Sequence, residues 1–197
     1  MACSNLRYIL SFLLLLTVSK LSFGDELKFN EPKIDANGNV VLTYVLEDLP
    51  INADEILKAS AKYLENEYKT TKYTDIETIA EKSIVYGKGC MNSFFTDNGL
   101  TKSEVFSAVY YLRIDAKDGK ARIQLIFNKY DEQQLSDLSD QKVYSVTISE
   151  VAPFADAKNN GRYKKAFYHL TENAEIVLKS IVDKLKSVSP APVMDEW

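Results

Sequence analysis

The side chains that most often carry out catalysis or bind metals are few in this chain and far apart. His169 is the only histidine, so a Ser–His–Asp triad, a Cys–His pair or most zinc sites would have to use it. It lies off the apolar stripe of a predicted C-terminal helix, which favours an ordinary exposed histidine. Cys90 follows Gly87-Lys88-Gly89 in a predicted strand, which favours a small buried hydrophobic residue over a nucleophile. The glycines there indicate a bulge or a close backbone approach, because a phosphate-binding loop needs a longer run ending in Gly-Lys-Ser/Thr.

Carboxylates are plentiful, but no pair of them stands out as a general acid and base. Asp54 and Glu55 belong to the start of a predicted helix, and Asp137 and Asp140 belong to a polar stretch. The acidic stretch 131–140 lacks the Asp-x-Asp-x-Asp-Gly spacing of a calcium loop. The sequence therefore predicts no catalytic residue, no cofactor site and no metal site.

Tyrosine is the unusual feature of the composition, with 12 Tyr against 1 Trp. Aromatic side chains on an exposed sheet face can bind sugars, peptides or apolar ligands, and they are enriched at interfaces. We therefore take Tyr86, Tyr111, Arg113 and Tyr144 as the candidate face for a ligand or partner. The alternative is that these tyrosines are ordinary half-buried strand residues.

A sheet must position these side chains, and the segment 104–128 predicts its centre. Apolar residues alternate with polar ones on both sides of Asp118-Gly119, which is the pattern of two strands. A two-residue turn of mirror-image type there needs positive φ at both positions, which Asp and Gly tolerate. The resulting register pairs Ile114 with Ile123, Leu112 with Leu125, Tyr110 with Phe127, and Asp115 with Arg122.

Two amphipathic helices flank this hairpin in the sequence. The first begins at Asn52, where Glu55 completes a capping box and Ile51 can pack on Ile56. Its predicted buried stripe is Ala53, Leu57, Ala61, Leu64 and Tyr68. The second spans about 163–187, with the stripe Tyr163, Phe167, Leu170, Ala174, Val177, Ile181 and Leu185.

The remaining strands complete an α+β domain. They are predicted over 40–46, 73–80, 83–91 and 143–151, with a polar surface excursion at 131–141. Because the strands are grouped and the helices segregated, we expect an antiparallel sheet in the order strand, helix, strands, helix. Both helices should cover one face, with Leu64 and Ile181 over the row that includes Leu112 and Leu125. The other face should be partly open.

The first 24 residues are typical of a secretory signal peptide. Arg7 precedes the apolar run 8–18, and Ser22 and Gly24 are small residues suited to cleavage before Asp25. We therefore expect an exported protein, periplasmic or extracellular, with one domain over 25–188, a disordered tail over 189–197 and no integral membrane segment. Cleavage removes two basic residues and no acidic one, so the net charge of −4 becomes −6, which argues against nucleic acid as a partner.

Three segments together resemble a known family. LTYVLEDLPINADEILKASAKYLENEY, SIVYGKG and VYYLRIDAKDGKARIQLIFN are similar to a domain-of-unknown-function family of secreted Bacteroidetes proteins. The resemblance covers about 40–130, and the C-terminal helix by order of elements only. It implies a TATA-box-binding-protein-like (TBP-like) fold and a location in the cell envelope. It implies no activity and no site residue, and the fold name does not imply DNA binding.

Two functions are compatible with these patterns. The first is a non-catalytic module that binds an envelope protein or a small ligand through its sheet or the groove between sheet and helices. The second is an envelope hydrolase that uses carboxylates and tyrosines on glycans or peptides. The absence of a recognisable catalytic set favours the first, so an enzyme is the less favoured interpretation.

Overall fold

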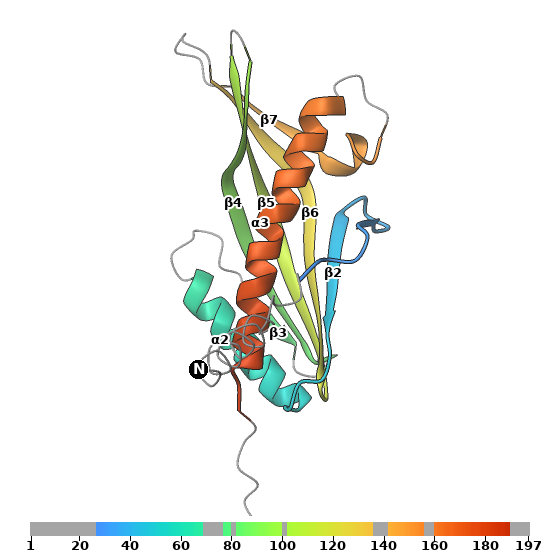
Figure 1. Cartoon of the computed structure of the whole chain (residues 1–197), viewed down its shortest axis with the longest axis vertical. Helices are drawn as coiled ribbons and strands as arrows, with labels where there is room; N and C mark the ends of the chain where they lie inside the picture. Colours follow the sequence, from blue (N-terminus) through green and yellow to red (C-terminus); the bar gives the residue numbers. More distant parts are fainter. Residues whose placement is uncertain are drawn as a thin grey trace, which may run out of the picture.

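The structure, a computed structural model, describes residues 27–68, 77–79, 82–99, 102–135, 142–155 and 160–189. Its elements are β1 (Lys33–Ile34), β2 (Val40–Leu46), α2 (Ala53–Tyr68), β3 (Glu77–Ile79), β4 (Ile84–Asn98), β5 (Ser103–Lys117), β6 (Lys120–Leu135), β7 (Lys142–Thr147), the short 3₁₀ helix η2 (Ile148–Glu150) and α3 (Asn160–Lys186). In the sequence, the long strands follow one another, with α2 before them and α3 after them. The predicted α+β class is therefore confirmed (Figure 1). The predicted signal peptide, and the tail beyond Ser189, lie outside the described residues.

The described strands form one seven-stranded antiparallel sheet in the order β1-β2-β6-β5-β4-β3. One edge of the long strand β6 is shared, because β2 pairs with its first half and β7 with its second half. At the centre, Ile114 lies opposite Ile123 and Asp115 opposite Arg122, so the predicted hairpin register is confirmed. The register shifts between Ala108 and Tyr110.

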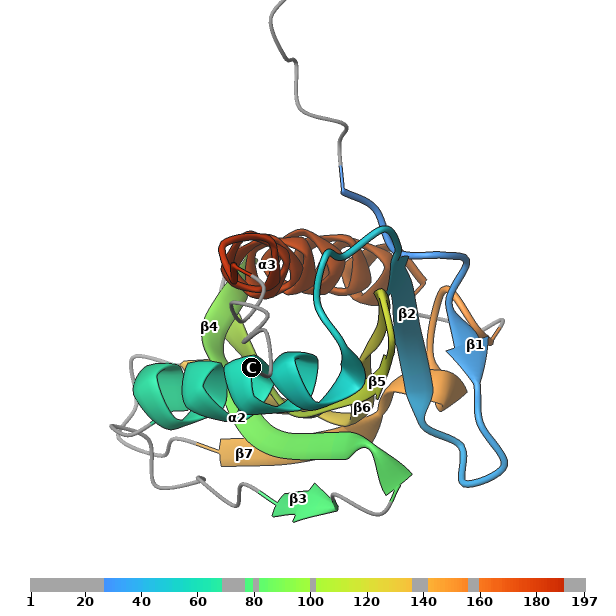
Figure 2. The same ribbon diagram turned by 90° about the horizontal axis from the view of Figure 1, so that it is seen from below.

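Both helices pack on the same face of the sheet, which bends around them (Figure 2). Leu64 on α2 and Ile181 on α3 are buried in one apolar core with Leu112 and Leu125, as predicted. Gly87 on β4 lies directly beneath α2. A Cβ atom at this position would be 2.8 Å from Leu64 Cδ2, so the glycine allows a close approach of strand and helix, which is the second of the two predicted alternatives.

The β5–β6 turn is fastened to the start of α2. Asn52 and Glu55 form the two hydrogen bonds of the predicted capping box. The carboxylate of Asp118 adds one more bond at the helix start, which it accepts from the Ala53 N–H at 2.9 Å. The N–H of Gly119 donates to the carbonyl of Ile51. The expectation of positive φ at both turn positions was wrong, because only Gly119 has it, at 72°. The hydrogen bonds from the turn to α2 and to Ile51 hold it in a conformation in which Asp118 does not have positive φ.

Gly119→Val is expected to lower the free energy of unfolding by roughly 1–3 kcal/mol, because valine at positive φ is strained. Lys117→Ala, on the exposed end of β5, should change it by less than about 0.5 kcal/mol. Urea denaturation of both variants checks this. Equal stability of the two variants would show that Gly119 does not need its left-handed conformation.

Several predicted boundaries were wrong because the strands are longer than their sequence patterns. β4 continues past Met91 to Asn98, through an irregularity between Met91 and Phe95 that interrupts the alternation. β6 continues to Leu135, so the first part of the predicted surface excursion is strand paired with β5 and β7. The strand predicted over 143–151 ends at Thr147 and is followed by η2. Of the strand predicted over 73–80, only β3 lies within the described residues.

Candidate functional site: the open face of the sheet

Three of the four predicted partner-face residues lie together on the face of the sheet away from the helices. Tyr86 on β4 pairs with Arg113 on β5, and Tyr111 is two residues before Arg113 on the same side of the strand. The guanidinium carbon of Arg113 is 5.6 Å from the centre of the Tyr86 ring. Tyr111 has 50% of its surface exposed. We call this surface the open face.

Tyr144, the fourth predicted residue, lies on the other face. It pairs with Glu132, whose side chain is buried on the helix side. The register shift beside Ala108 accounts for this placement. It puts Phe127 and Tyr130, three residues apart, on the same side, so the far half of β6 and the strand β7 paired with it do not continue the alternation of the hairpin.

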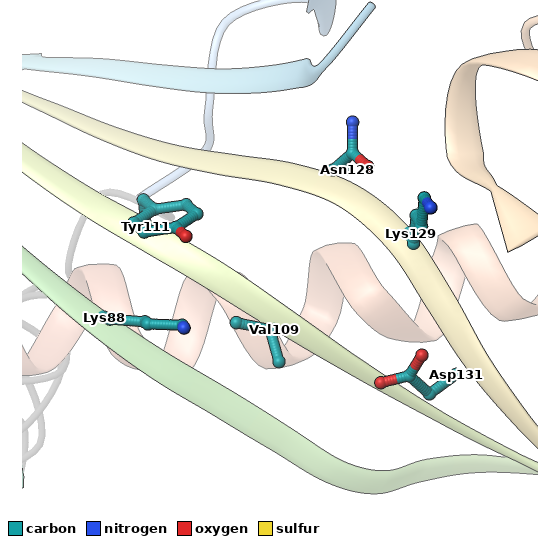
Figure 3. A pocket seen from close by; sticks show the side chains of 6 residues that line it. All are labelled: Lys88, Val109, Tyr111, Asn128, Lys129 and Asp131. Carbon is teal, nitrogen blue, oxygen red and sulfur yellow. The ribbon is translucent and has the colours of Figure 1, made fainter. Parts of the chain in front are cut away.

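A shallow hollow of about 280 Å³ lies in the open face beside Tyr111 (Figure 3). Its lining comes from three neighbouring strands: Lys88, Val109, Tyr111, Asn128, Lys129 and Asp131. The ammonium group of Lys88 is 5.7 Å from the centre of the Tyr111 ring. The side chains in Figure 3 lie in front of the strands, and the helix lies behind them. The hollow is therefore accessible from the side that no described helix covers.

An ion-pair network fixes the side chains of the open face near the β5–β6 turn. Arg113 Nη2 and Arg122 Nε donate to the two carboxylate oxygens of Asp115 at 2.7 and 2.9 Å. The Asp115–Arg122 pair was predicted from the hairpin register. Burial acts to raise the pKa of Asp115, but its bonds to the two arginines outweigh burial and lower that pKa. Asp115 is therefore a fixed anion rather than a proton donor.

Cys90 and His169 do not form a catalytic pair. Cys90 pairs with Val109 on the open face, and its half-buried thiol donates to Asn92 Oδ1 at 3.0 Å. Burial, together with the charge of Asp131, raises the pKa of this thiol, which is the opposite of what a nucleophile needs. His169 lies on α3 on the helix side, where its ring stacks on Phe95 and bonds to Glu172.

A second polar cluster, which the sequence did not reveal, joins α3 to the sheet. Glu104 on β5 and Glu132 on β6 are both buried, and both form ion pairs with Arg162 at the start of α3. Tyr163 accepts a hydrogen bond from Arg162 Nη2 at 2.9 Å and donates to Glu132 at 3.2 Å. Lys102 also pairs with Glu104, at 2.7 Å.

Glu104 in this cluster is not suited to be a general acid. Burial acts to raise the pKa of Glu104, but hydrogen bonds and charge from Lys102 and Arg162 outweigh it and lower that pKa. A general acid at neutral pH needs a raised pKa, whereas Glu104 stays ionised and paired. The cluster is therefore a structural connection between helix and sheet.

Tyr130, which lies beside this cluster, allows a test of the hydrogen bonding of its buried hydroxyl groups. Its hydroxyl is buried and has no hydrogen-bond partner among the described residues, and burial raises its pKa. Tyr130→Phe is therefore expected to raise the free energy of unfolding by about 1 kcal/mol. Tyr163→Phe, in the ring stacked beside it, should lower the same quantity by about 1.5–3 kcal/mol, because its hydroxyl bonds to charged groups. Urea melts of both variants check the opposite signs, and a destabilised Tyr130→Phe protein would contradict the first.

Two further findings concern the described residues only. No three of their His, Cys, Asp and Glu side chains are grouped so as to hold a metal ion. None of their helices is both long enough and apolar enough to cross a membrane.

The fold defined by this sheet and its two helices is TBP-like. A TBP-like protein from Parabacteroides distasonis has a TM-score of 0.60 and 14% identity, and the match covers 79% of this chain and 97% of that one. A DUF4468 family protein from Bacteroides ovatus has a TM-score of 0.51 and 13% identity, covering 80% and 92% respectively. Neither a family model nor a curated protein matches the sequence. At such identities the two solved structures show the fold alone, which confirms the predicted architecture.

Proposed function

We propose that this protein is a non-catalytic binding module whose partner contacts the open face of the sheet. The observation that carries the proposal is Tyr111, a large aromatic side chain that is half exposed in the middle of the sheet, beside the hollow formed by three strands. Burying an exposed tyrosine is favourable, and tyrosine and arginine are enriched at interfaces. The titratable groups described above support binding over catalysis, because Glu104 and Asp115 are held ionised in ion pairs and the pKa of Cys90 is raised.

Export to the periplasm or the cell exterior is part of the proposal. Its support is the sequence pattern of residues 1–24, with small residues at Ser22 and Gly24. Mass spectrometry of the protein isolated from outside the cytoplasm tests it. A mature N-terminus at Asp25 is expected, and a retained Met1 would contradict export by cleavage.

The test of binding compares two tyrosines of similar exposure on opposite sides of the molecule. Tyr111→Ser removes the ring at the centre of the open face, and Tyr168→Ser removes one from the outer surface of α3, where Tyr168 is 60% exposed. Proteins and ligands that co-purify with each variant from the native host are quantified against the parent. We expect the specific partner to be lost with Tyr111→Ser and retained with Tyr168→Ser.

Retention of the same partners by both variants would show that the open face is not the binding surface. Thermal melts of both proteins should accompany the comparison. Since each ring is at least half exposed, neither substitution should change the fold, and a loss of partner can then be assigned to the surface.

A further inference from the structure

The charges of this protein are unevenly distributed between its two sides. The whole chain carries a net charge of −4, yet the open face is rich in basic residues. Strand pairing and, for Lys129, the lining of the hollow beside Tyr111 place the following on it: Lys33, Lys88, Arg113, Lys117, Lys120, Arg122 and Lys129. The carboxylates at this face are Asp115 and Asp131, with Glu77 on β3 at the register position opposite Tyr86. Lys120 is paired with Glu47 at 2.8 Å, so the basic residues still outnumber the acidic ones there. Such a segregated surface attracts a partner of opposite charge.

Several of these cations remain available to a partner. Lys117 and Lys129 are exposed and form no ion pair with the described residues. Lys129 borders the hollow beside Tyr111. Lys117 borders a second hollow of about 260 Å³, lined by Val45, Asp115, Lys117, Lys120, Ala121 and Arg122. The open face therefore offers two separate hollows, each with a free ammonium group at its border.

The aromatic rings of this face are already occupied by cations. Lys88 lies over Tyr111, and Arg113 lies over Tyr86. Sugars and nucleobases bind aromatic side chains by stacking on the ring face. Because a basic group already occupies a position over each ring, this arrangement favours carboxylates that bond to the basic groups over ligands that stack.

The shape of the open face also restricts the partner. The sheet bends around the helices, so the open face is its outer, convex side (Figure 2). A flat membrane or a stiff double helix would touch such a surface only along a narrow strip. A flexible polypeptide can follow the curvature and place successive side chains in both hollows.

We propose that the partner of the open face is an acidic, extended polypeptide segment, whose carboxylates bind the basic groups beside Tyr111 and at the second hollow. This inference rests on the proposed function and names the chemical class of its partner. Binding of an acidic segment differs from binding through the Tyr111 ring, because its affinity should fall with added salt. The affinity should also fall when charges are reversed on the open face, but not when they are reversed on the helix side.

The experiment uses fluorescent poly-L-glutamate as the probe and measures its binding by anisotropy at 20 mM and 200 mM NaCl. Lys117→Glu/Lys129→Glu reverses two exposed charges of the open face. Lys62→Glu/Lys165→Glu, on the exposed faces of α2 and α3, makes the same change in net charge on the other side. We expect the first pair to weaken binding at least about tenfold, the second to change it less than about twofold, and the parent to lose at least about tenfold at the higher salt.

Several results would overturn the inference. The first is no binding of poly-L-glutamate at 20 mM NaCl, and the second is an equal loss of affinity for it in both charge-reversed proteins. The third is that heparin, single-stranded DNA or phosphatidylglycerol vesicles bind more tightly than poly-L-glutamate through the same lysines. The co-purification test separates this failure from failure of the proposed function. A native partner that is lost with Tyr111→Ser but retained with Lys117→Glu/Lys129→Glu would leave the binding module intact and reject the acidic partner.

Discussion

Arg162→Leu is expected to lower the free energy of unfolding by about 3–5 kcal/mol at pH 7, the range for breaking a buried ion pair from one side. Arg162 is the shared partner of Glu104 and Glu132, whose side chains are each only 7% exposed. Leucine removes the charge and the hydrogen bonds but leaves both carboxylates in the core between α3 and the sheet. The cost comes from these two buried anions, of which Glu104 keeps only the half-exposed Lys102 as an ion-pair partner, rather than from lost packing.

The pH dependence distinguishes this cause from a packing defect. In the parent, the pKa of Glu104 is lowered, so its contribution to stability is present above the unfolded pKa and is lost as the pH falls through the folded one. In Arg162→Leu, Glu104 is buried without the Arg162 charge that helps to lower its pKa, so it gains a proton more readily as the pH falls. The difference between the two proteins should therefore shrink between pH 7 and pH 4, as measured by urea melts.

Two controls accompany Arg162→Leu. Lys102→Ala removes the half-exposed partner of Glu104 and should cost no more than about 1 kcal/mol, since solvent screens this pair. Adding Glu104→Gln and Glu132→Gln to Arg162→Leu should recover part of the lost stability at pH 7. A loss that is the same at both pH values and is not recovered would show that Arg162 acts through packing.

The contact of α2 with β4 gives the second large effect. Leu64→Ala should lower the free energy of unfolding by about 2–5 kcal/mol, because Leu64 is fully buried. Gly87→Ala should cost about 1–3 kcal/mol, because the new methyl group would meet Leu64 Cδ2 at 2.8 Å in a packed core. The double variant should cost less than the sum of the two, because the methyl group partly fills the space that the leucine vacates.

A double-mutant cycle by urea denaturation measures this coupling. Glu65→Ala, on the wet side of the same helix turn, is the matched control and should stay within about 0.5 kcal/mol of the parent. Additive costs for Leu64→Ala and Gly87→Ala would mean that the two residues do not touch. A Leu64→Ala protein as stable as the parent would contradict the placement of α2 on the sheet.

The parts of the structure that the sequence predicted correctly are governed by local rules. The hairpin register followed from the Asp118-Gly119 turn together with alternation over a few residues on each side. The capping box at Asn52 and Glu55 likewise depends on residues three apart. In both cases the interacting groups are close in the sequence, so their spacing alone restricts the geometry.

The parts that could not be predicted depend on distant partners. Arg162 meets Glu104 across 58 residues, and nothing in the spacing of either one indicates the other. The position of Tyr144 had a different cause, because the register shift beside Ala108 puts Tyr130 and Glu132 of β6, and the β7 residues opposite them, on the helix side. The burial of Glu132 also could not be predicted, because its polar segment resembles a surface loop until its pairing with β5 and β7 is known.

The bond between Asp118 and the start of α2 has a consequence for the order of folding. A helix and a hairpin each form within microseconds from residues close in sequence. Asp118 and Ala53 are 65 residues apart, so their bond requires the closure of a long loop, with an entropic cost that the local elements do not bear. We therefore expect the tip of the hairpin to dock on α2 late in folding. An Asp118→Ala variant should accordingly change the unfolding rate more than the folding rate.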